Sequence, residues 1–199
     1  MTTSLPSGLR ERKKARTRAA IREHAMRLFE EQGYAATTVD QIAEAAEVSQ
    51  STFFRYFPTK EDVVLADDLD PLIVAAVKAQ PPEVPPITAI RNAIHEVVDN
   101  VSAEEWEREQ RRQRMFRHTP ELMSRAMVQY TDTIRLLGEA VADRAGLPPA
   151  DFAARVLAGA VIGAALAAIP NGGTGDVQLT DFARLDKALA LLEAGLPLS

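Results

Sequence analysis

Cysteine is absent from the 199 residues, which excludes disulfide bonds and zinc sites built on thiolates. Long apolar runs are absent too, since the longest, residues 156–169, has 14 residues, short of the ~18 expected of a membrane-spanning helix. The N-terminus, MTTSLPSGLRERKK, has no apolar stretch ahead of its charges and is not expected to be a secretory signal. These absences predict a soluble, cytoplasmic protein with no membrane partner.

Histidine is scarce, and His24, His95 and His118 fall on separate predicted helices. None of the three lies in a pattern typical of a nucleophile, a metal site or a phosphate-binding loop. His95 beside Glu96 and His118 near Glu121 resemble acid–base pairs, but chance neighbours at a surface are the commoner explanation. We therefore predict that the protein is not an enzyme and uses no metal or cofactor.

Charge is distributed unevenly along the chain. The net charge of −5 argues by itself against a nucleic-acid partner. Residues 1–60, however, hold ten Lys and Arg against seven Asp and Glu, a net charge of +3, which leaves −8 for residues 61–199. A solvated basic tail and an arm lying along phosphates are both open explanations. The positive run consists of Arg10, Arg12, Lys13, Lys14, Arg16, Arg18 and Arg22.

Residues 37–60, TTVDQIAEAAEVSQSTFFRYFPTK, have the pattern of two short helices joined by a tight turn. The first helix is predicted over residues 39–46 and the second over residues 50–57. Two such helices joined by three residues are typical of a helix-turn-helix. The boundaries follow from a capping box, a second N-cap and a proline, namely Thr38 with Gln41, Ser49 and Pro58.

The second of these helices has two distinct faces. Phe53 and Phe57, four residues apart, are predicted to pack inward. The outward side chains suit a DNA groove, because Gln can read adenine, Arg can bind guanine or phosphate, and an aromatic ring can contact a thymine methyl. The predicted DNA-binding residues are Gln50, Ser51, Thr52, Phe54, Arg55 and Tyr56, with Thr38, Lys60, Arg12, Lys13 and Arg16 nearby.

The string LFEEQGYAATTVDQIAEAAEVSQSTFFRYFPTKEDVV, residues 28–64, resembles the N-terminal domain of the tetracycline-repressor (TetR) family of bacterial transcription regulators. The resemblance covers about residues 10 to 65. It departs at Glu47, where the family usually has Gly, and at Phe54, where it often has Tyr. It implies an all-α fold, with an N-terminal three-helix helix-turn-helix domain and a C-terminal helical domain for ligand binding and dimerisation. A repressor released from DNA by a small apolar effector is the implied function.

Downstream of the motif, the helix that begins near Thr59 is expected to break or kink at Asp70-Pro71. The segment QPPEVPP, residues 80–86, is a predicted linker. Further helices, about nine in all or ten with a break, are predicted over residues 87–101, 103–118, 120–145, 149–169 and 180–194, with a PNGGTG loop before the last. The predicted divisions are a disordered segment 1–9, a DNA-binding domain 10–65 and a ligand-binding and dimerisation domain 66–199.

A methionine and aromatic stripe follows the linker. Such a stripe is usually core, but it also suits an adaptable apolar pocket, and the resemblance implies an effector cavity in this domain. The candidate ligand-binding residues are Trp106, Met115, Phe116, Met123, Met127 and Tyr130.

The apolar helix over residues 156–169 carries small residues at four-residue spacing, which permits close helix packing. This helix is either domain core or a subunit interface. The resemblance favours the interface, because family members dimerise through their last two long helices, and it implies a homodimer on a pseudo-palindromic operator. The candidate interface residues are Gly159, Gly163, Ala167, Phe182, Leu185 and Leu189.

The pairing of LRERKKARTRAAI with FFRYFPTKEDVVL and a following Asp-Pro looks like the branch of actinobacterial regulators associated with mycofactocin clusters. That resemblance implies an acyl-coenzyme A (acyl-CoA) effector. The arginines of residues 108–117 are then candidates for the phosphates of its head group. A solvated face with internal ion pairs is the plainer explanation for this segment.

Overall fold

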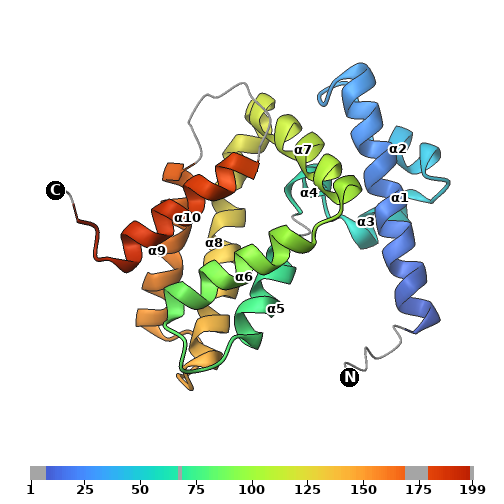
Figure 1. Ribbon diagram of the computed structural model, residues 1–199. Helices are drawn as coiled ribbons and strands as arrows, with labels where there is room; N and C mark the ends of the chain where they lie inside the picture. Colours follow the sequence, from blue (N-terminus) through green and yellow to red (C-terminus); the bar gives the residue numbers. More distant parts are fainter. Residues whose placement is uncertain (1–7, 67–68, 169–178, 198–199) are drawn as a thin grey trace. The chain divides into compact units, whose positions relative to one another are not determined.

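The computed structural model describes residues 8–66, 69–168 and 179–197, and within these ranges all regular structure is helical (Figure 1). This confirms the all-α prediction. The described helices are α1 (Leu9–Gln32), α2 (Val39–Ala45), α3 (Gln50–Tyr56), α4 (Asp62–Leu65), α5 (Asp70–Ala79), α6 (Pro86–Asn100), α7 (Ala103–His118), α8 (Pro120–Arg144), α9 (Phe152–Ala168) and α10 (Leu179–Glu193). Three predicted features lie outside the described residues: segment 1–7, the end of a helix at Ile169 and the PNGGTG loop.

The chain divides into two compact units. The first unit comprises Met1–Ala66 with Met115–Leu122, and the second comprises Asp67–Arg114 with Met123–Ser199. The predicted boundary after residue 65 lies next to the division at Ala66. The prediction did not anticipate that residues 115–122 join the first unit.

The core of the first unit is built from α1–α4 around aromatic side chains. Phe29, Phe53 and Phe57 are almost fully buried, and the ring centroids of Phe53 and Phe57 lie 6.0 Å apart. Leu122, at the start of α8, is also fully buried in this core. The first unit is therefore completed by a segment that lies far along the chain from the motif.

Local capping explains the helix-turn-helix. Thr38 and Gln41 form the predicted capping box: the Thr38 hydroxyl accepts from the Gln41 N–H at 3.3 Å, and the Gln41 side chain accepts from the Thr38 N–H at 2.9 Å. The Ser49 hydroxyl accepts from the Thr52 N–H at 3.1 Å and starts α3. Glu47, in the turn, has a φ of 52°, in the left-handed region that favours glycine.

Two later helix starts show the effect of proline. α4 ends at Leu65 and α5 starts at Asp70 with Pro71 in its first turn, so the expected break is present and the described helices number ten. α9 starts three residues later than predicted from Pro149. Ala150 has a φ of 63°, which is incompatible with a right-handed helix, and the Asp151 side chain caps the new start through the Ala154 N–H at 2.9 Å.

The core of the second unit joins α5, α6, α8, α9 and α10. Ile90, Leu137, Ala158 and Leu189 are nearly or fully buried in it. α8 and α9 approach closely at Gly138, where an added Cβ would lie 3.3 Å from the Arg155 Cα. None of the described helices combines the length and apolar character needed to cross a membrane.

Candidate nucleic-acid interface

α3 presents the outward face that the sequence predicts. Phe53 is fully buried, whereas Gln50, Ser51 and Arg55 are exposed and Phe54 is 47% exposed. The Phe54 ring meets the Phe53 ring edge to face at 5.5 Å, so a core side chain supports the exposed one. An amide, a guanidinium and an apolar ring are therefore available on one short helix.

Hydroxyl groups at the start of α3 bond mainly to one another. The Ser49 hydroxyl lies 2.9 Å from the Ser51 hydroxyl and 3.0 Å from the Thr52 hydroxyl. Arg55 Nη2 donates to the Thr52 hydroxyl at 3.4 Å, and its guanidinium lies 5.5 Å from the Tyr56 ring centroid. Thr52 is thus a support for Arg55 in this structure.

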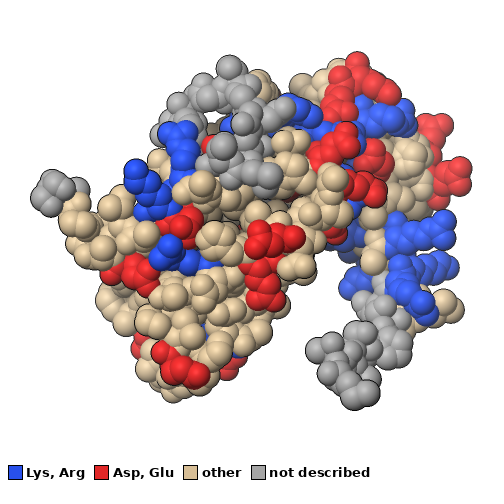
Figure 2. Space-filling model, viewed as in Figure 1, with Lys and Arg blue, Asp and Glu red and all other residues tan. Residues whose placement is uncertain are grey.

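The basic run of α1 serves two purposes. Arg18 Nη1 donates to the Tyr56 carbonyl at 3.1 Å with its guanidinium 4.5 Å from the Phe57 ring centroid, and Arg22 Nη2 donates to the Ala66 carbonyl at 3.1 Å. These two arginines therefore satisfy carbonyls at the ends of α3 and α4. Tyr56 itself is partly buried against the core. Figure 2 shows basic side chains around the N-terminal half of α1, where the exposed residues are Arg10, Arg12, Lys13, Lys14 and Arg16.

Two further predicted contacts have structural partners. Thr38 is exposed, and its hydroxyl is used in the capping box of α2. Lys60 points inward, since its Nζ donates to the carbonyls of Tyr34 at 2.8 Å and Thr37 at 3.0 Å. The sequence placed Lys60 among the predicted DNA-binding residues. It could not show these carbonyls, which lie more than 20 residues earlier.

A family model described as bacterial regulatory proteins, tetR family, matches residues 21–66, and one described as MftR C-terminal domain matches residues 84–197, more than half of the chain. The chain belongs to the TetR family. It is therefore a DNA-binding transcription regulator and not an enzyme.

Two curated TetR-family relatives extend this comparison. The regulator TcmR of Streptomyces glaucescens is 43% identical over 110 residues, which cover 53% of this chain and 49% of TcmR. This chain thus spans about half the length of that relative. The Mycobacterium tuberculosis regulator MftR, named for mycofactocin biosynthesis, is 28% identical over 160 residues, which cover 79% of this chain and 80% of MftR.

Solved TetR-family structures share the fold. FadR of Thermus thermophilus, solved in complex with lauroyl-CoA, has a TM-score of 0.52 at 24% identity and covers 92% of this chain and 96% of its own. SmeT of Stenotrophomonas maltophilia, solved with triclosan, has a TM-score of 0.54 at 19% identity and covers 87% of this chain and 90% of its own.

The six candidate ligand residues occupy different environments. Met115 and Phe116 pack against the core of the first unit, and Trp106 packs against Phe182 with ring centroids 5.5 Å apart. Met123 and Met127 are 49% and 68% exposed. Tyr130 is partly buried, and burial raises the pKa of its phenol.

Two arginines of α7, Arg108 and Arg112, pair with acidic neighbours on the same helix. Arg112 is 6% exposed and its guanidinium lies 2.6 Å from the Glu109 carboxylate, while Arg108 lies 2.8 Å from Glu104. These pairs correspond to the plainer of the two explanations, internal ion pairing. The burial of Arg112 was not expected from the sequence.

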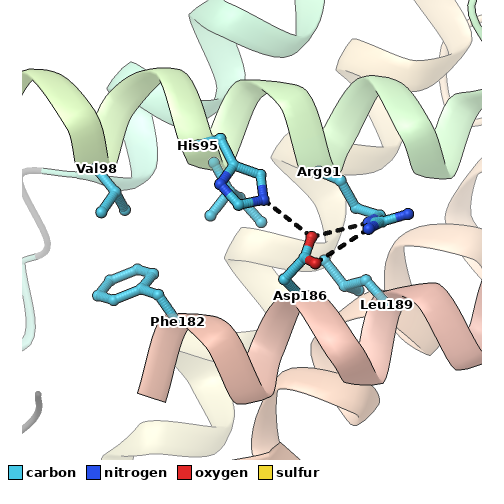
Figure 3. A pocket seen from close by; sticks show the side chains of 7 residues that line it. Arg91, His95, Val98, Phe182, Asp186 and Leu189 are labelled. Atoms are coloured by element: carbon cyan, nitrogen blue, oxygen red, sulfur yellow. Dashed lines mark hydrogen bonds and ion pairs between the residues drawn. The ribbon is translucent and has the colours of Figure 1, made fainter. Parts of the chain in front are cut away.

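A shallow recess, open to solvent, lies between α6 and α10 (Figure 3). Arg91 binds Asp186 with two hydrogen bonds of 2.9 and 3.0 Å and Glu193 with one of 2.8 Å. His95 Nε2 lies 3.0 Å from the same Asp186 carboxylate. This cluster was not predicted from the sequence. The available signal was charge at helical spacing on two otherwise amphipathic helices, but nothing local indicated that the two helices meet.

The candidate interface residues divide between two environments. On α9, Gly163 and Ala167 are exposed, and a Cβ added at Gly159 or Gly163 would meet nothing within 4 Å. On α10, Leu189 is fully buried and Leu185 packs in the core of its own unit, while Phe182 contacts Trp106. The three α10 residues are thus used within the protomer. Helical periodicity identified their apolar face but not its partner.

Proposed function

We propose that this TetR-family regulator is a dimeric repressor that binds a pseudo-palindromic operator through α3 and is released by a small apolar effector. The observation that carries the proposal is the outward face of α3, on which Gln50, Phe54 and Arg55 are exposed above the buried Phe53. Base-edge readout requires such side chains on a helix that fits the major groove.

The dimer is proposed to form through the outward face of α9. Phe152 and Val156 are 74% and 54% exposed, and the exposed face continues along the helix through Gly163 to Leu166 at 40%. An apolar surface of this kind is typical of a site that another chain covers. Closed two-fold dimers are the commonest oligomers, and they would place two α3 helices on half-sites about 34–36 Å apart or a multiple of that.

The effector is proposed to be an acyl-CoA with a long chain. Support comes from the MftR-type C-terminal domain over residues 84–197 and from the lauroyl-CoA bound by FadR, which shares the fold. Burial of an acyl chain stabilises a complex by about 0.8 kcal/mol per CH₂ group. A ligand that prefers the DNA-free arrangement of the protein then lowers operator affinity.

The test is a gel-shift and anisotropy assay with the intergenic DNA beside the protein's own gene. Acyl-CoA of increasing chain length, from C4 to C16, is titrated into the complex, with free CoA and the free fatty acids as controls. We expect release that improves steadily with chain length. Release that is independent of chain length, or no release, would reject the acyl-CoA effector. If no apolar ligand changes operator affinity, the protein is a ligand-independent DNA-binding protein.

A further inference from the structure

Lys60 occupies the corner between α3 and α4. Its Nζ donates to the Tyr34 carbonyl at 2.8 Å and to the Thr37 carbonyl at 3.0 Å, and it lies 4.2 Å from the Tyr34 ring centroid. The ammonium of a lysine has three donors. Two are directed to carbonyls, and the ring face provides a cation–π contact on a further side.

The accepting turn, residues 33–37 between α1 and α2, is itself tightly bonded. Thr37 is 1% exposed, and its hydroxyl lies 2.9 Å from the Gly33 carbonyl and 3.1 Å from the Gln32 side-chain nitrogen. Buried carbonyls in such a turn need partners. The Tyr34 carbonyl also accepts from the Thr37 N–H at 3.3 Å, and Lys60, more than 20 residues later in the chain, adds a charged donor to the carbonyls of both Tyr34 and Thr37.

The turn at residues 33–37 and the corner at Lys60 lie on either side of the helix-turn-helix. The Thr37 carbonyl immediately precedes the capping box that starts α2, and Lys60 follows α3 by four residues. A bond between the corners therefore fixes the start of α2 relative to the end of α3. Base readout depends on such fixed placement, because a reading helix displaced by about 1 Å loses its hydrogen bonds.

We propose that Lys60 is a positioning residue of the helix-turn-helix. It acts through the turn at residues 33–37 and makes no phosphate contact. The proposal rests on the proposed use of α3 in operator reading. It divides the lysines of the first unit into two kinds. Lys13 and Lys14, which are exposed on α1, remain candidates for phosphate contacts, whereas the ammonium of Lys60 is committed to the protein itself.

Lysine acetylation with and without DNA tests this division, because the chain has only five lysines, Lys13, Lys14, Lys60, Lys78 and Lys187. The full-length protein is treated with N-acetoxysuccinimide and mapped by mass spectrometry. In free protein, Lys60 should react about tenfold more slowly than Lys14, because its charged hydrogen bonds must open first. Operator DNA should slow Lys13 and Lys14 and leave Lys60, Lys78 and Lys187 unchanged.

The alternatives are separable. If Lys60 reacts as fast as Lys14, or if DNA protects Lys60, the positioning role is overturned. If DNA protects no lysine and no binding is seen by anisotropy, the proposed operator reading fails, while slow labelling of Lys60 still supports the bond between the corners.

A salt titration of operator binding adds a second test. Lys60→Met should lower operator affinity at least tenfold and reduce the ratio of operator affinity to random-DNA affinity. The slope of log affinity against log salt concentration should stay unchanged. Lys60→Arg should recover part of that loss. Lys14→Met is the matched control and should reduce the slope by about one unit. A reduced slope for Lys60→Met would identify a phosphate contact and contradict the proposal. If Lys60→Met does not fold, Lys60→Gln and the acetylation map decide.

Discussion

Among single residues, Glu47 has the clearest energetic consequence. Its φ of 52° places a side chain in the left-handed region, at a cost of about 1 to 2 kcal/mol relative to glycine. Glu47→Gly should therefore raise the free energy of unfolding by about 1 kcal/mol in urea titrations. Ala19→Gly, at an exposed position inside α1, is the control and should lower it by about 0.5–1 kcal/mol. Equal losses in both variants would contradict the expectation.

Phe54 permits a prediction at the level of one methyl group. Its exposed ring, held by Phe53, is proposed to contact a thymine C5-methyl. Replacing operator thymines one at a time by deoxyuridine should reduce affinity at one position per half-site, by roughly 1 kcal/mol for a lost methyl contact. In Phe54→Ala the same substitution should have no effect, whereas Phe54→Tyr should keep the sensitivity. A deoxyuridine effect that survives in Phe54→Ala would assign the contact to another side chain.

Features that depend on contacts between residues close together in the sequence could be predicted, whereas features that depend on distant residues could not. The boundaries of α2 and α3 depend on contacts three or four residues apart, at Thr38 and Ser49, and they were placed to within a residue. The start of α9 was misplaced because proline at residue 149 is compatible with a helix start, whereas the left-handed Ala150 is visible only in the structure. The inward turn of Lys60 depends on partners distant in the chain, which no local pattern reveals.

For the helices, α8 makes a distinct prediction, because it begins in the first unit and continues in the second. Leu122 is fully buried in the core of the first unit. Leu122→Ala should therefore destabilise that unit by about 2–5 kcal/mol. Hydrogen exchange should accelerate first in α1–α4. Leu136→Ala, at a position of α8 that is 39% exposed, is the control, and faster exchange confined to the second unit in Leu122→Ala would contradict the assignment.

The ion pairs between Arg91 and His95 of α6 and Asp186 and Glu193 of α10 make the stability of the fold depend on pH. Hydrogen bonds from Arg91 and then His95 lower the pKa of Asp186 from its usual 3.8, and bonds from Thr88 and Arg91 lower that of Glu193 from 4.5. A carboxylate whose pKa is lower in the folded state than in the unfolded state stabilises the fold at pH values above its unfolded pKa. This contribution is lost as the pH falls through its folded pKa.

Wild type should therefore exceed Arg91→Met in unfolding free energy at pH 7, and the difference should shrink as pH falls below about 4. Urea titrations across this range measure it. Arg155→Met, which removes an exposed charge from α9, should show no such convergence. A difference that stays constant down to the lowest pH would mean that packing, and not the carboxylates, accounts for the effect of Arg91.

For the whole molecule, the proposed dimer depends on the exposed face of α9. Gly163→Arg adds a charged side chain at a position where a Cβ meets nothing within the protomer, so the protomer should keep its fold. We expect a monomer in analytical ultracentrifugation and a loss of affinity for the full operator, with half-site binding retained. Ala75→Arg, at an exposed position of α5, is the charge-matched control and should remain dimeric. A dimer formed by Gly163→Arg would place the interface elsewhere.

The burial of Leu122 in the first core also has a consequence for protein synthesis. The helix-turn-helix is complete in sequence at Ala66, but Leu122 leaves the ribosome 56 residues later. At about 5–20 residues per second, that delay is roughly 3 to 11 s. During this interval the nascent helix-turn-helix lacks one core side chain and exposes the apolar surface that Leu122 later covers. The core of the first unit is therefore complete only after 56 residues beyond the helix-turn-helix have been made.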